Sequence, residues 1–136
     1  MKLVPLIIIA VNSQTLTAHM ISKLFKHVGY ALQGFKWGFE RELHIRYHSL
    51  AALIAIVLGL FARLNRFEWI AIVLCIGAVF CAEFLNSAIE KLADYVQPEY
   101  HMDIKRVKDL AAAAVLVVAL TALVVAVFIF YPHFAG

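Results

Sequence analysis

Three long apolar stretches dominate the pattern of hydrophobic and polar positions along the chain. Residues 110–130 read LAAAAVLVVALTALVVAVFIF and contain no charged side chain. A run of this length can cross a bilayer as a helix. The stretch 43–62 is polar only at its start, and the stretch 67–90 has Glu68 near its start and a polar group near its end. The pattern predicts three transmembrane helices.

A fourth segment, residues 21–42, precedes these stretches and reads ISKLFKHVGYALQGFKWGFERE. Its apolar side chains recur with nearly helical spacing, and most of its lysines and arginines fall elsewhere on the helical wheel. This pattern is typical of a basic amphipathic helix that lies on a membrane surface. The expected fold class is an all-α membrane protein, with three transmembrane helices preceded by a basic amphipathic surface helix.

Residues 1–19 fit this plan poorly. Their first half, MKLVPLIIIAV, resembles a signal peptide, because one lysine is followed by a short apolar run. No convincing small-residue cleavage site follows it. Met20 would make a natural start. We therefore expect residues 1–19 to be an N-terminal extension or a mis-assigned start without a role in function. Residues 20–136 are then expected to form a single integral-membrane domain.

The composition also indicates that much of the chain is surrounded by lipid. Hydrophobic residues make up 64% of the 136 positions and charged residues only 15%, and a soluble chain of this length has too little interior to bury so much apolar surface. The net charge is +3, but the basic residues are scattered and no aromatic–basic groove pattern occurs, so we expect no nucleic-acid partner. The two cysteines predict neither a disulfide nor a zinc site.

The distribution of lysine and arginine predicts the orientation in the membrane. Five of these residues lie between positions 23 and 46, and four lie between positions 91 and 108. Two lie in the connection 63–66, and none follows Phe130. Because basic residues favour the cytoplasmic side, the N-terminus and the 91–108 connection should be cytoplasmic and the C-terminus should be outside.

A row of polar side chains, within CAEFLNSAIEKLADYV, occurs where the second span should be ending. At about 100° per residue, these side chains share one face of a helix. The polar row consists of Glu83, Asn86, Ser87, Glu90 and Asp94. It begins within the hydrocarbon and reaches the cytoplasmic interface. Acidic residues at such depth are costly when unpaired, and they indicate a functional site by default.

The residues of the row suit a base and a hard cation. Glu83 is the deeper carboxylate and the better candidate for a general base. Glu90 lies nearer the interface and is the better candidate for a Mg²⁺ ligand, since Mg²⁺ is typically bound by one or two carboxylates together with phosphate oxygens. Lys108, beside Asp109 at the start of the third span, could hold a nucleotide phosphate as a point charge. A lysine that snorkels to the interface is the simpler explanation of Lys108 taken alone.

Other interpretations of the row are open at this point. Its carboxylates could pair with lysine or arginine on another helix and serve only to hold helices together. The chain could also be a small channel or proton-pathway subunit, although a pore favours polar residues through the whole membrane thickness. A non-catalytic membrane scaffold is a third possibility, but it requires no acidic cluster.

The sequence AEFLNSAIEKLADYV, followed by PEYH and then KDLAAAAVL, resembles the signature of a family of small bacterial membrane enzymes. This is the integral-membrane diacylglycerol kinase / undecaprenol kinase family, and the resemblance covers roughly residues 26–130. It implies a homotrimer of three-span subunits in the bacterial inner membrane. It also implies a lipid kinase that phosphorylates a membrane lipid alcohol from ATP and Mg²⁺ at the cytoplasmic face.

Residue by residue, the resemblance implies roles for the polar row. Glu83 resembles the general base, which takes the proton of the lipid hydroxyl as its oxygen attacks the γ-phosphate. Glu90 resembles the metal-binding glutamate. Asn86 resembles a polar contact to the nucleotide or the metal.

Outside the row, Lys108 and Asp109 resemble nucleotide contacts, and Glu42 matches an acidic position before the first span. One position departs from the diacylglycerol kinase pattern, because His48 stands where that type has a second metal-binding glutamate. The undecaprenol kinase type has a similar histidine, which favours undecaprenol as the lipid, with diacylglycerol next. Either His48 or Glu42 could supply the second metal or nucleotide contact, and Glu42 is the better Mg²⁺ ligand of the two.

Overall fold

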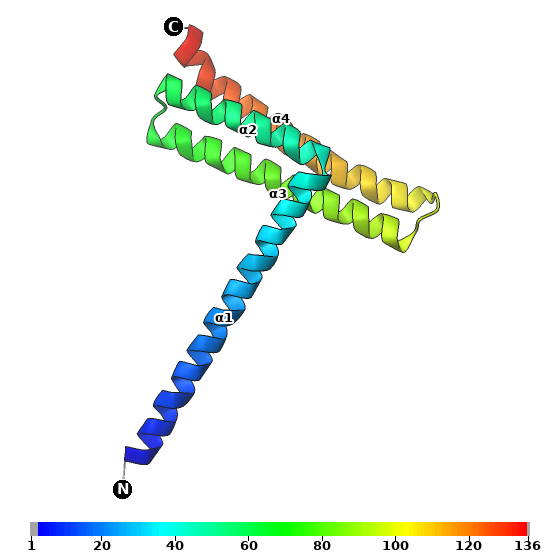
Figure 1. The fold of residues 1–136 in the computed structure, drawn as a ribbon. Coiled ribbons are helices and arrows are strands. Elements are labelled where there is room, and N and C mark those ends of the chain that lie inside the picture. Colours follow the sequence, from blue (N-terminus) through cyan, green and yellow to red (C-terminus); the bar gives the residue numbers. More distant parts are fainter. Residues whose placement is uncertain (1–2, 136) are drawn as a thin grey trace. The chain divides into compact units, whose positions relative to one another are not determined.

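The computed structural model describes residues 3–135, and it describes the side chains of residues 19, 20 and 22–135. Within this range the chain forms four helices and no strand (Figure 1). They are α1 (Leu3–Arg41), α2 (Leu43–Ala62), α3 (Arg66–Val96) and α4 (Met102–Ala135). The predicted all-α class is confirmed.

Helix α1 contains all of the predicted amphipathic segment 21–42 except Glu42, and it begins earlier, at Leu3. Residues up to Trp37 form one compact unit, and the chain from Gly38 onwards forms a second. The prediction that residues 1–19 have no functional role falls mostly on side chains outside the described ones, and it stays a prediction.

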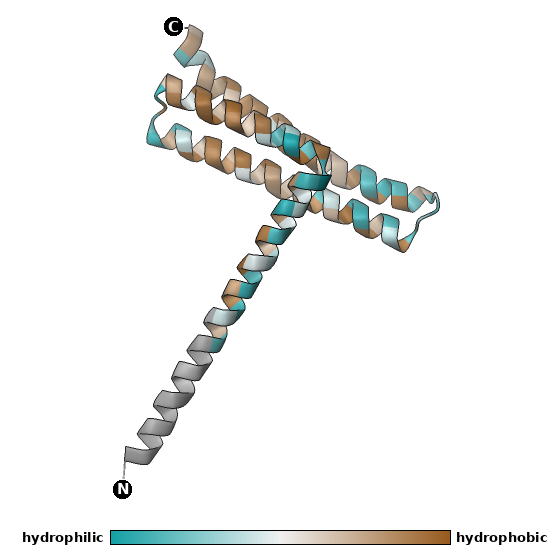
Figure 2. Cartoon of the chain, viewed as in Figure 1, coloured by the Kyte–Doolittle hydropathy of each residue, from teal (hydrophilic) through white to brown (hydrophobic). Residues whose placement is uncertain are grey.

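Helices α2, α3 and α4 are each long and apolar enough to cross a membrane. Figure 2 shows apolar residues along most of their length. Few side chains are buried within the second unit, and many large apolar ones, such as Leu53, Val73 and Leu120, are exposed. This arrangement suits helices that face lipid or other helices, because apolar side chains are stable in an apolar surrounding and a helix bonds most of its backbone groups within itself.

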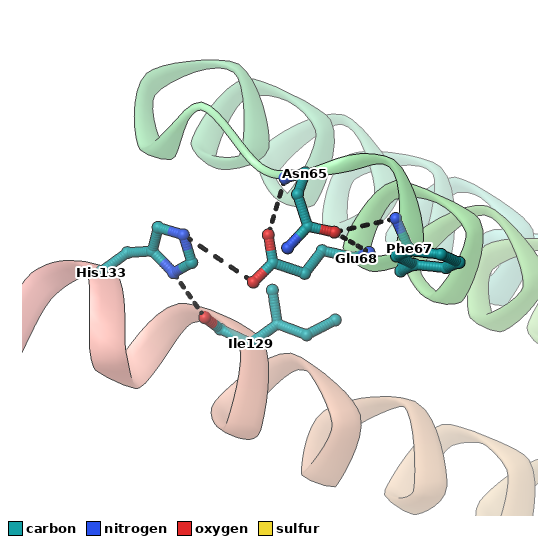
Figure 3. Close-up of polar contacts among 5 residues, drawn as sticks. All are labelled: Asn65, Phe67, Glu68, Ile129 and His133. Atoms are coloured by element: carbon teal, nitrogen blue, oxygen red, sulfur yellow. Dashed lines mark hydrogen bonds and ion pairs between the residues drawn. The ribbon is translucent and has the colours of Figure 1, made fainter.

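A tight turn joins α2 to α3. Arg63 adopts a left-handed conformation with φ 54°, and the backbone N–H of Leu64 donates to the carbonyl of Gly59. Asn65 then caps α3: its side-chain oxygen accepts hydrogen bonds from the backbone of Phe67 and Glu68 (Figure 3). This turn fixes the antiparallel register of α2 against α3.

The connection between α3 and α4 is shorter than the predicted 91–108 segment. Helix α3 ends at Val96, just before Pro98, and α4 begins at Met102, so only residues 97–101 lie outside the helices. The two helices lie side by side and antiparallel (Figure 1). At the far end of the pair, His133 Nε2 lies 3.8 Å from Glu68 Oε1 (Figure 3).

The lengths of α3 and α4 matter for the site. Both continue beyond the predicted spans 67–90 and 110–130. The whole polar row is therefore on α3, and Lys108 is on a helix rather than in a loop. Polar residues gather at the joined ends of the two helices (Figure 2).

Candidate active site

The polar row of α3 runs from the interior of the second unit to its surface. Glu83, Asn86 and Ser87 are buried, with 3%, 9% and 7% of their surface exposed. Within the described part of the chain they are the polar residues that reach this degree of burial. Glu90 is half-buried and Asp94 is exposed. The row thus joins a desolvated carboxylate to an open, charged end of the helix.

Glu83, at the buried end, is paired with His48 of α2. The distance from His48 Nε2 to Glu83 Oε1 is 2.8 Å. The Glu83 side chain is only 4% exposed and the His48 side chain is 28% exposed. Such a pair can hold the Glu83 carboxylate in one orientation, as a positioned general base requires.

The contact between His48 and Glu83 was not expected from the sequence. The family resemblance left either His48 or Glu42 as the second metal or nucleotide contact, whereas the structure places the imidazole of His48 on the carboxylate of Glu83. The sequence holds a coarse signal for this contact, because His48 and Glu83 each lie about four to five helical turns from the α2–α3 connection. An antiparallel hairpin places them at a similar level, but the exact turn decides which residues pair.

One helical turn beyond Glu83, the amide of Asn86 donates from Nδ2 to Glu90 Oε1 over 3.0 Å. This bond orients both side chains on the same face of α3. It leaves Asn86 Oδ1 buried, with no hydrogen-bond partner among the described residues. This oxygen could therefore accept a hydrogen bond or bind a cation.

Glu42 joins this part of the site from the junction before α2. Its Oε1 lies 3.2 Å from Lys91 Nζ, on the turn of α3 that also carries Glu90. The Glu42 side chain is 14% exposed. The contact with Lys91 is an ion pair without hydrogen-bonding geometry, so Glu42 Oε1 is a second buried oxygen that lacks a hydrogen-bond partner in the described range.

The junction that carries Glu42 is held by two local features. The guanidinium of Arg46 donates hydrogen bonds to the backbone carbonyls of Phe39 and Glu40. Gly38 packs closely on α3, since a Cβ at this position would lie 2.6 Å from the ring of Phe84. Only a residue without a side chain allows this approach.

Lys108 and Asp109 have different surroundings. Lys108 Nζ donates to Asp94 Oδ1 over 2.9 Å, and it is close enough to Glu90 to interact with its charge. The structure therefore brings Lys108 to the open end of the row. Asp109 is exposed, and the contact that the structure gives it is Lys105 of the same helix.

The donor set is compatible with Mg²⁺. No group of three His, Cys, Asp or Glu side chains within the described residues is close enough to hold a metal alone. Mg²⁺ needs fewer protein ligands when phosphate oxygens complete its shell. Buried polar atoms without partners are rare and are explained in some proteins by an ion. Among the described residues, two buried side-chain atoms lack a hydrogen-bond partner, Glu42 Oε1 and Asn86 Oδ1, and both are oxygens. Asn86 is bonded to Glu90, and Glu42 contacts Lys91, the next residue in sequence.

Comparison with known proteins identifies the class of enzyme. Residues 29–130 match the family described as prokaryotic diacylglycerol kinase. The chain is 33% identical to undecaprenol kinase of Bacillus subtilis (strain 168) over 112 residues, which is 82% of this chain and 91% of the relative. It is 28% identical to diacylglycerol kinase of Escherichia coli (strain K12) over 113 residues, 83% of this chain and 93% of the relative.

These matches and the three apolar helices define a multi-pass lipid kinase of the inner membrane. The chain belongs to the prokaryotic diacylglycerol kinase family. The predicted kinase class is confirmed over the channel subunit and the scaffold.

Proposed function

We propose that this enzyme transfers the γ-phosphoryl group of ATP, with Mg²⁺, to the hydroxyl of undecaprenol at the cytoplasmic face of the membrane, with diacylglycerol as the second choice. The similarity to an undecaprenol kinase and to diacylglycerol kinases supports this choice of lipids. The observation that carries the proposal is the buried Glu83 carboxylate, held by His48 and followed by a row of oxygens that leads out to a lysine.

In this proposal, Glu83 accepts the proton of the lipid hydroxyl. The hydroxyl oxygen forms a bond to the γ-phosphorus while the bond from that phosphorus to the bridging oxygen breaks, and ADP leaves. His48 keeps the Glu83 carboxylate oriented toward the hydroxyl. Phosphoryl transfer asks a protein mainly for positioning and charge stabilisation, and both are available along one face of α3.

Glu90, Asn86 and Glu42 would hold Mg²⁺, which neutralises charge on the phosphates when it is bound. The buried oxygens Asn86 Oδ1 and Glu42 Oε1, which lack hydrogen-bond partners among the described residues, support this assignment. Lys108 would exchange its contact with Asp94 for a nucleotide phosphate. We keep Asp109 as a proposed nucleotide contact on the family resemblance, with its exposed carboxylate available beside Lys105.

The proposed orientation follows the basic residues: the N-terminus and the 91–108 segment, which includes the connection between α3 and α4, are cytoplasmic, and the C-terminus is outside. We also propose a homotrimer, as the family resemblance implies. The many exposed apolar side chains of the spans leave ample surface for contacts between subunits.

The test is a phosphoryl-transfer assay in bilayers with undecaprenol, ATP and Mg²⁺. We expect Glu83→Gln to lower kcat by about 100-fold or more, because a positioned general base typically contributes about 10²–10⁴-fold. Glu68→Gln is the matched control, since it makes the same substitution at the other end of α3 and glutamine also serves in a capping box. Wild-type kcat in Glu83→Gln would remove Glu83 as the base.

A further inference from the structure

An apolar groove lies between α2, α3 and α4 in the second unit. It has a volume of about 430 Å³, which is within the range of small-molecule sites. Alanines from two of the helices line much of it, including Ala51 and Ala55 on α2 and Ala122 and Ala126 on α4. These small side chains leave open the space that larger ones would fill.

The groove leads to the catalytic carboxylate. His48 lines it at one end of the α2 wall, and Leu58 is the last α2 residue along it. The ten helical steps from His48 to Leu58 correspond to about 15 Å at 1.5 Å per residue. Because His48 also contacts Glu83 over 2.8 Å, a hydroxyl at this end of the groove would lie beside the proposed base.

The lining has almost no hydrogen-bonding capacity. Among the described residues that line the groove, His48 is the one with strong polar atoms, and its Nε2 is already in contact with Glu83. The other lining groups are aliphatic or aromatic, apart from the thiol of Cys75. An ester carbonyl placed here would lose its water without gaining a donor, which is unfavourable. A hydrocarbon chain makes no hydrogen bonds to water, so it would lose none on entering the groove.

We propose that this groove binds the first part of the hydrocarbon chain of the lipid alcohol, and that it selects a single-chain alcohol without esters, such as an isoprenoid alcohol. This inference rests on the proposed function and assigns its lipid site. Diacylglycerol carries two chains and two ester groups next to its hydroxyl. The groove lies between three helices and offers almost no donor for an ester, so diacylglycerol fits it poorly.

The first test locates the chain directly. The full-length protein in bilayers is irradiated with an isoprenoid alcohol that carries a diazirine near its hydroxyl end, and labelled positions are read by mass spectrometry. We expect labels on groove residues of all three helices and competition by unlabelled undecaprenol. Labels spread over the exposed faces of the spans, as bulk lipid would give, overturn the proposal.

The second test fills the groove. Ala126→Leu and Ala55→Leu should each raise the KM for undecaprenol at least tenfold and leave the KM for ATP unchanged. Ala113→Leu is the matched control, because Ala113 is exposed on α4 and does not line the groove. Equal effects of the groove and control variants on the KM for undecaprenol contradict the assignment.

These outcomes separate this inference from the proposed function. If the wild type phosphorylates no lipid alcohol, the proposed function itself fails. If the wild type is active but labels avoid the groove, only the groove assignment fails. A groove variant that changes the oligomeric mass in native mass spectrometry, together with absent groove labels, would show that a helix of a second copy fills the groove, and this also overturns the proposal.

Discussion

The contact between His48 and Glu83 predicts how a change at His48 should affect kcat. The change is His48→Ala, which leaves a carboxylate that is 4% exposed without its partner. A hydrogen bond to a charged group contributes about 1.5–3 kcal/mol. Because the His48 side chain is 28% exposed, we take the lower part of that range, about 2 kcal/mol. If this energy orients Glu83 in the transition state, kcat should fall about 30-fold, at roughly 1.36 kcal/mol per factor of ten.

The assay is transfer of phosphate to undecaprenol in bilayers at saturating ATP and Mg²⁺. His48→Gln should retain most of the activity, because its amide nitrogen can donate to Glu83 from a similar reach. If His48 had only a structural role, His48→Gln would not keep more activity than His48→Ala. A circular-dichroism melt checks that all variants are equally folded.

A double-mutant cycle then tests whether the two side chains act as a unit. In the Glu83→Gln background, His48→Ala should cause little further loss, since the interaction that it removes is already gone. If the loss in the double variant instead equals the product of the two single losses, His48 acts independently of Glu83 and the reasoning from their contact is refuted.

Two further predictions concern the junction and the open end of the row. Gly38→Ala should lower stability by about 1–3 kcal/mol, because its Cβ would lie 2.6 Å from the ring of Phe84, whereas Gly29→Ala, with nothing within 4 Å, should stabilise its helix by up to about 1 kcal/mol. Thermal unfolding in the same detergent compares them, and equal melting temperatures would exclude the close contact. Lys108→Ala should raise the KM for ATP with little effect on the KM for the lipid, and the neighbouring Lys105→Ala is its control. Equal effects of both lysine variants would show that general surface charge, rather than Lys108, attracts the nucleotide.

The local features of this protein could be predicted well from its sequence. An uncharged stretch such as residues 110–130 can only be accommodated in water at great cost, so hydropathy alone places it in the membrane. The helical period likewise predicts that Glu83 and Glu90 share a face, because this depends only on positions within one helix. The structure places Glu83 in the interior and Glu90 nearer the surface, in the same order along α3.

The partners across helices were not predictable in the same way. The pairs His48–Glu83 and Glu42–Lys91 depend on the register of a hairpin and on the close approach at Gly38. Register is set by the exact turn, here the left-handed Arg63 and the cap that follows it, and hydropathy does not report it. The ends of α3 and α4 were also missed, because hydropathy marks only the apolar part of a helix. Where a helix continues outside the membrane with polar residues, hydropathy does not show it.

The most direct measurement of the central claim is a competition assay with the purified protein in one bilayer. The bilayer contains undecaprenol and diacylglycerol in equal amounts, and ATP labelled at the γ-phosphate is added with Mg²⁺. The account predicts undecaprenyl phosphate as the main labelled product, and about 100-fold less product from Glu83→Gln. Labelled lipid from Glu83→Gln at the wild-type rate, or no labelled lipid from the wild type, would contradict it.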